Sequence, residues 1–399
     1  MPAIDSIEQP VWRDPRAIAL MIAASLTVMT AATISPALPG LERQFPGTDS
    51  NAFLVRMLVP APSLAVVLIA PFCGMLVDRS GKRRVLLAGL VLFILAGSAG
   101  LILPSLSLIL VSRLGLGVAL AMIMTAQSAL LGDYFSRGAL DKVSSGQVSA
   151  RNFGGLVFIL LAGFLATVGS RLPFAIYALP LLILPFFWRV IVEPPRQAPS
   201  VASRSMPGAE TAQRLVLLLA CGQMVVTMLF FTMPTQLPFF LSAKGYTSPA
   251  MTGAALGTLM LAGGVTALFY PRIREHIGHD GNWTCGFGLM AAGFAVLVMS
   301  KTETAVFVGC AAIGAGYALT VPGFVALSLA ATPPERRGRT GALLTGSVFL
   351  GQFLSPIFCS PAVAYWGWRS SGIGLAVILG FASVVFAASV AVSNSRSRR

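Results

Sequence analysis

Charge is scarce in this 399-residue sequence, in which charged residues make up 11% of the chain and hydrophobic residues 56%. A soluble globular domain carries roughly 25% charged residues, so the composition excludes an ordinary water-soluble fold. We therefore expect the lipid bilayer, rather than water, to surround most of the chain.

Residues and motifs for catalysis and metal binding are scarce as well. The two histidines, His276 and His279, lie in one short polar segment, which leaves few general bases. The five cysteines lie in apolar runs without the spacing of a metal site. The sequence contains no Walker loop and no nucleophile motif. We expect no enzyme activity, no metal site and no bound cofactor.

Twelve apolar runs dominate the sequence instead. A helix needs about 20 mainly apolar residues to cross about 30 Å of hydrocarbon, and it must satisfy its own backbone hydrogen bonds there. The runs span residues 17–37, 54–77, 85–103, 107–131, 146–169, 172–191, 214–236, 250–271, 283–300, 304–330, 341–365 and 370–393. The first run is too long for a cleavable signal peptide. We predict an all-α membrane protein with twelve transmembrane helices.

The basic residues are distributed unequally between the two sides of the predicted bundle. With the N-terminus in the cytoplasm, 20 of the 28 Lys and Arg residues lie on the cytoplasmic side and six on the opposite side. This bias predicts that both termini are cytoplasmic. The net charge of +14 could indicate nucleic acid binding, but the cations lie in separate short connections rather than on one face, so we expect no nucleic acid partner.

An internal repeat divides the chain into two halves. "PALP" from Pro36 recurs as "PTQLP" from Pro234, and "LGLG" from Leu114 recurs as "IGAG" from Ile313. "GMLVDRSGKRRV" from Gly74 recurs in weaker form as "PRIREHIG". The offset between the copies is 197 to 200 residues. We predict a duplicated six-helix unit, with bundles at residues 1–190 and 214–399 and a cytoplasmic linker at 191–213 rich in Pro, Ser and Ala.

Two parallel six-helix halves are the architecture of major facilitator transporters. "GMLVDRSGKRRV" resembles the signature of that superfamily between the second and third helices, and "RLGLGVALA" from Arg113 resembles its fourth-helix motif. The resemblance implies the major facilitator fold, with two pseudo-symmetric bundles. It also implies a secondary active transporter that works by alternating access, similar to the bacterial proton-coupled exporters of drugs and metabolites.

The hairpin at Gly74 to Val85 is a candidate gating latch. Gly74 would allow close helix approach, Gly81 a tight turn, and the cations contact with anionic lipid head groups. By the resemblance, Asp78 packs at the N-terminal end of the eleventh helix in the outward-facing state. The predicted latch comprises Gly74, Asp78, Arg79, Gly81, Arg83, Asp133 and Arg137. The alternative is a loop that only anchors the topology, which would require neither the acid nor the glycines.

Polar residues inside the spans are candidates for a substrate cavity. Arg113 lies several residues inside its helix, where a cation costs at least about 2.5 kcal/mol, so it should face a water-filled cavity or a partner. The alternative is a side chain that snorkels outward, but its depth and the match to the family motif favour the cavity. For Arg151 a cavity position and a snorkelling position stay open. By the resemblance, helices 1, 4, 7 and 10 line the cavity. The candidates are Arg113, Gln127, Arg151, Asn152, Phe231, Gln236, Tyr317 and Phe324.

Two features depart from the pattern of the exporters. Helix 5 carries Phe158 and Ile159 where they have a Gly-Pro step, and helix 1 contains no embedded carboxylate. Glu42, Asp78 or Asp133 could couple protons instead. Two embedded cations without an embedded anion favour a neutral or anionic substrate.

We therefore expect a monomeric exporter of a small organic molecule in a bacterial inner membrane, with lipids and protons as further partners and antiport as the mode of efflux. The alternatives are a facilitator or importer of an anionic metabolite, and a membrane sensor that does not transport.

Overall fold

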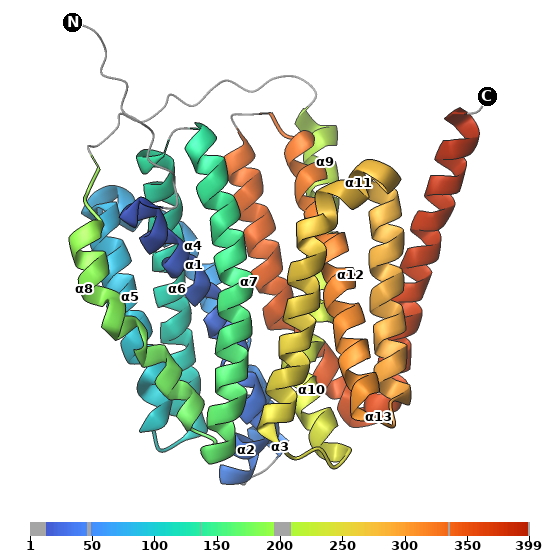
Figure 1. Cartoon of the computed structure of the whole chain (residues 1–399), viewed down its shortest axis with the longest axis horizontal. Helices are drawn as coiled ribbons and strands as arrows, with labels where there is room; N and C mark the ends of the chain where they lie inside the picture. Colours follow the sequence, from blue (N-terminus) through green and yellow to red (C-terminus); the bar gives the residue numbers. More distant parts are fainter. Residues whose placement is uncertain (1–12, 46–48, 136, 195–208, 334–335, 398–399) are drawn as a thin grey trace, which may run out of the picture.

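The computed structural model describes residues 13–45, 49–135, 137–194, 209–333 and 336–397. In these residues the chain forms two helical bundles that stand side by side, the first from α1 to α8 and the second from α9 to α13 (Figure 1). The beginning of α1 and the end of α13 lie at one end of the molecule, which we call the terminal face. The opposite end, where α2, α3 and α10 lie, is the distal face.

The first bundle contains most of the short helices. Its elements are α1 (Pro15–Ala32), η2 (Ser35–Ala37), α2 (Leu38–Gln44), α3 (Asp49–Met57), α4 (Ala61–Ser80), α5 (Lys82–Ser98), η3 (Ala99–Leu101), α6 (Leu106–Tyr134), α7 (Arg137–Val168), η4 (Leu172–Ala178) and α8 (Pro180–Val190). The second bundle consists of α9 (Ala209–Phe230), α10 (Thr232–Ala243), α11 (Pro249–Met299), α12 (Glu303–Ala330) and α13 (Arg337–Ser397).

Ten helices in the described part of the chain are long and apolar enough to cross a membrane. Two of them, α11 with 51 residues and α13 with 61, each contain one glycine with non-helical backbone angles, Gly278 (φ 70°) and Gly367 (φ 75°). A straight helix of 51 residues would be about 75 Å long, more than twice the thickness of the hydrocarbon. The chain reverses direction at both places (Figure 1), so each helix comprises two spans. This division is consistent with the twelve predicted.

Prolines interrupt several helices that the sequence predicts as single runs, including the sixth, where η4 is followed by α8 at Pro180. The first run breaks between α1 and α2 at Pro36, and the second breaks between α3 and α4 at Pro60. The seventh breaks at Phe231, three residues before Pro234. Proline lacks an N–H and crowds the preceding turn, so the backbone around it leaves carbonyl oxygens without a helical donor. Pro322, in contrast, lies inside α12, which continues past it.

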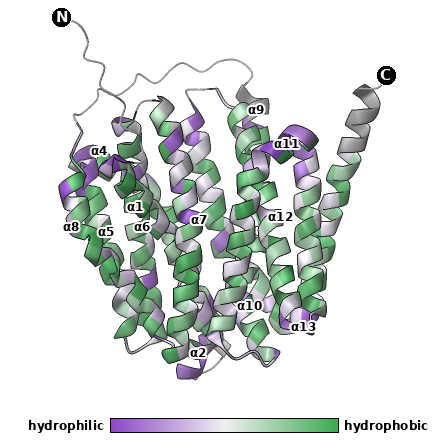
Figure 2. Cartoon of the chain, in the orientation of Figure 1, coloured by the Kyte–Doolittle hydropathy of each residue, from purple (hydrophilic) through white to green (hydrophobic). Residues whose placement is uncertain are grey.

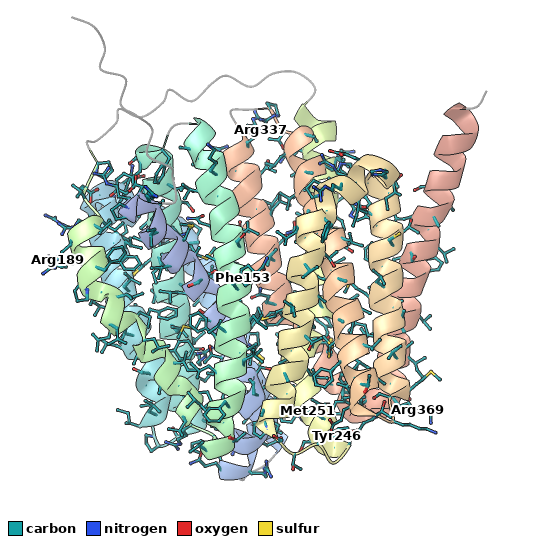
Figure 3. The ribbon with its side chains drawn as sticks, viewed as in Figure 1. Phe153, Arg189, Tyr246, Met251, Arg337 and Arg369 are labelled. Atoms are coloured by element: carbon teal, nitrogen blue, oxygen red, sulfur yellow. The ribbon has the colours of Figure 1, made fainter. Side chains whose placement is uncertain are left out.

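The outer surface is apolar along its length and polar at its two ends (Figure 2). Large side chains such as Leu182, 78% exposed, and Phe381, 70% exposed, lie outside the cores. In water such exposure would be unfavourable, whereas in lipid it costs nothing. Arg189 and Arg337 lie at the terminal face, and Tyr246, Met251 and Arg369 at the distal face (Figure 3). The fold is that of a multi-pass membrane protein.

Candidate functional site

Arg113 on α6 is completely buried in the first bundle. Its Nε donates to the carbonyl oxygen of Leu58 at 2.9 Å, and its Nη2 donates to the carbonyl oxygen of Thr30. The guanidinium carbon lies 5.1 Å from the ring centroid of Tyr177. The Tyr177 hydroxyl lies 3.2 Å from the carbonyl oxygen of Met29 and 3.3 Å from that of Thr30.

The broken helices explain why these carbonyl oxygens accept hydrogen bonds from Arg113. In a continuous helix the carbonyl of Leu58 would accept from the N–H of residue 62, but residue 62 is a proline. Thr30 lies in the last turn of α1, where carbonyl oxygens have no helical donor and the helix dipole favours a cation. Arg113 therefore satisfies backbone groups that the proline breaks leave open. It does not snorkel, and its predicted place in a substrate cavity stays a prediction.

The two bundles contact each other toward the distal face. The Ser35 hydroxyl donates to the carbonyl oxygen of Pro234, which joins the two repeat-related proline segments. The guanidinium of Arg56 lies 4.4 Å from the ring centroid of Phe239. Each hydrophobic core also contains one side chain from the other bundle. Phe231 of the second bundle packs in the core of the first, and Ile159 of the first bundle packs in the core of the second.

Helices α7 and α11 approach most closely at two glycines, Gly163 and Gly253. A Cβ atom added to Gly163 would lie 3.0 Å from the Cα of Gly253, and one added to Gly253 would lie 3.0 Å from the carbonyl oxygen of Ile159. Such distances leave no room for a side chain. Ile159, which stands where the exporters have their Gly-Pro step, thus lies within the contact between the bundles.

A second group of contacts lies at the middle of the molecule. Ser63 on α4 donates to Oε1 of Gln352 on α13 at 2.7 Å, across the two bundles. Phe230 stacks on Tyr317 with ring centroids 3.9 Å apart, and Thr227 Oγ1 lies 3.2 Å from the Tyr317 hydroxyl. Phe230 is half-buried and packs against the cores of both bundles.

The predicted cavity residues did not include Phe230, Thr227, Ser63 or Gln352, which belong to this group. We name this set, with Tyr317, the central group. Two phenylalanines in succession cannot be assigned to opposite faces without the position of the helix break, which here falls at Phe231. The signal that could have identified Phe230 is its place next to Phe231.

The other predicted cavity residues lie in different surroundings. Phe324 packs on Trp283 with ring centroids 4.9 Å apart, inside the second core, and Gln236 donates from Nε2 to Ser360 Oγ at 2.7 Å. Arg151 and Asn152 are half-buried on α7. The Asn152 Cβ would lie 3.6 Å from a Cβ added to Gly264 of the second bundle.

Gln127 is buried, and its Oε1 has no hydrogen-bond partner among the described residues. The same holds for Oε1 of Gln223, which is 2% exposed. Buried amide oxygens are normally paired, so these two atoms are available to a ligand or to water.

The hairpin between α4 and α5 is held by the segment that follows α8. The Glu193 carboxylate accepts from the backbone N–H of Lys82 at 2.7 Å and from that of Arg83 at 2.8 Å. It therefore caps the N-terminus of α5, where negative charge is favourable. Arg83 also donates from Nη2 to the carbonyl oxygen of Trp188 at 2.8 Å. The Lys82 ammonium forms an ion pair with Asp133.

These contacts change part of the prediction for the latch. Gly81 has φ 92° and allows the expected turn, and a Cβ added there would lie 3.0 Å from the Glu193 carboxylate. The expected close helix approach at Gly74 is wrong for this structure, since an added Cβ would meet nothing within 4 Å. Asp78 and Arg79 lie exposed in the last turn of α4. The Arg137 side chain lies outside the described residues. The gating role of this set stays a prediction.

The family model of the Major Facilitator Superfamily matches residues 20–302 and 246–399. The chain belongs to the Major Facilitator Superfamily. Its members are transporters, so membership confirms the predicted family and the expectation that the chain is not an enzyme.

Curated relatives of this superfamily member match at low identity. The Quinolone resistance protein NorA of Staphylococcus aureus (strain MRSA252) is 29% identical over 168 residues. That match covers 40% of this chain and 40% of the length of NorA. An uncharacterized MFS-type transporter of Burkholderia mallei (strain SAVP1) is 25% identical over 410 residues, or 98% of this chain and 94% of the relative.

Solved structures of the superfamily share the fold. A bacterial homolog of the human lysosomal transporter Spinster has a TM-score of 0.73 at 16% identity, with 95% of this chain and 97% of that chain covered. A D-xylose-proton symporter also has a TM-score of 0.73 at 16% identity, with 92% and 96% covered. These likenesses confirm the predicted fold class.

Proposed function

We propose that this protein is a secondary active transporter that exports a small organic molecule across a bacterial inner membrane by alternating access, with the terminal face in the cytoplasm. The contact between the bundles toward the distal face carries the proposal. Ile159 and Phe231 each pack in the core of the opposite bundle. These side chains, the glycine contact and the few polar contacts between the bundles can separate without unfolding either bundle, because each bundle retains its own core.

The alternating motion follows from this arrangement. Rotation of the bundles would withdraw Ile159 and Phe231 from the opposite cores and would open the distal face. Exposing a buried Ile or Phe costs about 1.5 to 3 kcal/mol per side chain in water, an amount that substrate binding or an ion gradient can supply. The structure then corresponds to the state that is closed at the distal face, which is inward-facing in the proposed orientation.

The residues of the central group favour a substrate that is flat and aromatic and that is uncharged or weakly anionic. The Phe230 and Tyr317 rings offer a stacking surface between the bundles, and the free amide oxygens of Gln127 and Gln223 can accept hydrogen bonds. Arg113 directs its donors to backbone carbonyls, while Arg151 is half-buried on α7. The names of the NorA relatives, quinolone resistance proteins, also favour a drug-like organic molecule.

Proton coupling would have to use acids near the ends of the helices. Glu42 lies 3.9 Å from Arg56 at the distal face, and Asp133 pairs with Lys82 at the terminal face. We propose that one of the three acids Glu42, Asp78 and Asp133 exchanges its proton between the two states. Antiport of protons against substrate then drives export.

Everted membrane vesicles test this function. A panel of uncharged, anionic and cationic fluorescent aromatic compounds is added with an imposed pH gradient, and substrate accumulation and proton release are recorded together. We expect accumulation of uncharged or anionic compounds that collapses when an ionophore removes the gradient. Equal flux with and without the gradient would support the facilitator instead. Preferred accumulation of a cationic dye would contradict the substrate class.

A conformational measurement separates transport from sensing. In a variant without its native cysteines, spin labels at Gln44 and Ala243 report the distance between the bundles at the distal face. We expect two distance populations whose ratio changes when substrate is added. We also expect substrate flux to be lost when a cross-link between the two positions replaces the labels. A change in distance with no flux for any compound would favour a sensor, and one fixed distance would contradict alternating access.

A further inference from the structure

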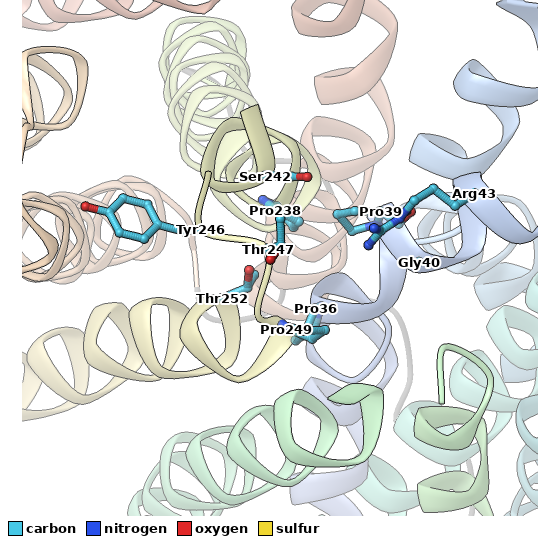
Figure 4. Close-up of a pocket in the computed structure, with 10 residues that line it drawn as sticks. All are labelled: Pro36, Pro39, Gly40, Arg43, Pro238, Ser242, Tyr246, Thr247, Pro249 and Thr252. Carbon is cyan, nitrogen blue, oxygen red and sulfur yellow. The ribbon is translucent and has the colours of Figure 1, made fainter. Parts of the chain in front are cut away.

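A cleft lies between the two bundles at the distal face, on the surface away from the central group. It is lined by Pro36, Pro39, Gly40 and Arg43 of the first bundle and by Pro238, Ser242, Tyr246, Thr247, Pro249 and Thr252 of the second (Figure 4). The prolines belong to the two copies of the repeat that meet here. Because both bundles contribute, the cleft exists only while the distal face is closed.

Hydrogen-bond donors from both bundles lie at this cleft. The Arg43 side chain extends from α2 toward it (Figure 4), and its Nε donates to the carbonyl oxygen of Pro39 at 3.2 Å. That contact leaves the two Nη groups of Arg43 free to bind an acceptor. Thr252 is 3% exposed and lines the cleft. Its hydroxyl lies beside Thr247 (Figure 4) and makes no hydrogen bond with the described residues.

The first turn of α11 adds a favourable dipole. Ser248 is the N-cap of this helix, and its side chain makes no capping hydrogen bond. Pro249 and Thr252 belong to the first turn and line the cleft. Pro249 has no N–H, and the N–H of Met251 donates to the carbonyl oxygen of Ser248 at 3.1 Å. This end of the helix therefore contributes its dipole, which favours negative charge. The guanidinium, the buried hydroxyl and the helix end therefore all favour the same kind of ligand.

The neighbouring charges do not neutralise Arg43. Glu42 lies beside Arg56 at 3.9 Å. The ammonium of Lys244 donates to the carbonyl oxygen of Ser300 and lies 2.9 Å from Ser300 Oγ, and partial desolvation lowers its pKa. Among the described residues that line the cleft, Arg43 is the one that carries charge.

We propose that this cleft binds a small monovalent anion, such as chloride, and that the bound anion stabilises closure of the distal face. The enclosed space has room for roughly one water-sized particle, which excludes a large organic anion. Arg43 supplies the charge. From the opposite bundle, Thr252 supplies a hydroxyl donor and the end of α11 a favourable dipole. A ligand that binds one of two states shifts the population toward that state. Binding itself requires only the closed distal face and does not rest on the proposed transport activity.

Purified protein in nanodiscs tests this proposal. The thermal midpoint is measured while chloride replaces gluconate, an anion too large for the cleft, at constant ionic strength. We expect a saturable rise with chloride. Arg43→Gln should raise the apparent dissociation constant at least about tenfold, because charge-assisted hydrogen bonds are lost, and Thr252→Val should raise it severalfold. Arg369→Gln, which removes an exposed cation elsewhere on the distal face, is the control and should leave the constant unchanged.

Spin labels at Gln44 and Ala243 give the second measurement, and chloride should enrich the shorter distance in the parent but not in Arg43→Gln. A chloride response that is equal in the parent and in Arg43→Gln would overturn the site. The site would also be overturned if Arg43→Gln lowered the thermal midpoint at every chloride concentration while the rise with chloride stayed the same. That result would assign Arg43 a structural role alone. A rise with chloride without any change in distance would overturn the coupling to closure.

Discussion

The sequence predicts that the two bundles are copies of one six-helix unit, yet they are held together in different ways. In the first, the buried Arg113 joins α6 to the broken ends of two other helices. Its counterpart at the repeat offset in the second bundle is Ala312. There, α11 and α12 pack through glycines instead, because a Cβ added to Gly316 would lie 2.4 Å from the carbonyl oxygen of Gly286 and one added to Gly293 would lie 2.7 Å from that of Gly309.

This difference shows how a duplicated unit accommodates different helix breaks. Where prolines interrupt helices 1 and 2, open carbonyl oxygens require a strong donor, and an arginine provides several. Where two helices of the second bundle remain continuous, backbone proximity gives dispersion contacts that lipid cannot replace. Close packing occurs in both copies, since a Cβ added to Gly117, the counterpart of Gly316, would lie 2.2 Å from the carbonyl oxygen of Pro62. The first copy adds the polar contact of Arg113.

Among the variants that test this difference between the bundles, a substitution at Gly314 should have the largest effect on stability. A Cβ added there would lie 2.0 Å from the carbonyl oxygen of Leu259, whereas at the repeat-related Gly115 it would lie 3.4 Å from the Ala96 Cβ, an ordinary contact. We expect Gly314→Ala to destabilise the protein by about 3 kcal/mol and Gly115→Ala to be close to neutral. Thermal unfolding in detergent measures both. Equal losses would remove the distinction between the bundles.

Arg113→Met should have the next largest effect. It leaves the carbonyl oxygen of Leu58 unpaired, at about 1 to 3 kcal/mol, and that of Thr30 with the Tyr177 hydroxyl as its donor, while it relieves part of the cost of a buried cation. We expect a net loss of about 2 kcal/mol in the same unfolding measurement. Arg113→Lys, which keeps a charge but fewer directed donors, should recover part of it. A variant Arg113→Met as stable as the parent would show that the carbonyl oxygens find other donors.

The repeat-related turns give a smaller contrast. Both Gly81 and Gly278 have positive φ, so Ala should cost about 1 to 2 kcal/mol at each. At Gly81 an added Cβ also meets the Glu193 carboxylate, while at Gly278 it meets nothing within 4 Å. We expect Gly81→Ala to lower the unfolding midpoint more than Gly278→Ala. The opposite order would contradict the role of Glu193 in holding the hairpin.

Glu193→Gln should have the smallest effect. It keeps one acceptor for the N-terminus of α5 but removes the charge, a loss of about 0.3 to 1 kcal/mol. The exposed Glu275 of the second hairpin, changed to Gln, is the matched control and should not alter stability. Hydrogen exchange at the Lys82 and Arg83 amides measures the cap directly, and exchange as slow in Glu193→Gln as in the parent would argue against it.

The sequence predicted the helical class and the family, because apolar run length and small-residue motifs are local signals. It predicted Gly81 as a turn residue for the same reason. It could not predict that Glu193, 111 residues after Lys82, caps α5, since a carboxylate in a polar segment has many possible partners. The break at Phe231 also decided which of two adjacent phenylalanines faces the opposite core. Gly74 was assigned a close contact from its type alone, and the structure places open space there.

The contact of Arg113 with main-chain oxygens has an evolutionary consequence. Any residue at positions 30 and 58 presents the same carbonyl, so those side chains can drift without altering the hydrogen bonds. Substitutions at Arg113 and at these positions should therefore not covary among homologues. Pro62 is the exception, since an ordinary residue there would restore the N–H that Leu58 lacks. Covariation, if it is found, should link Arg113 to that proline.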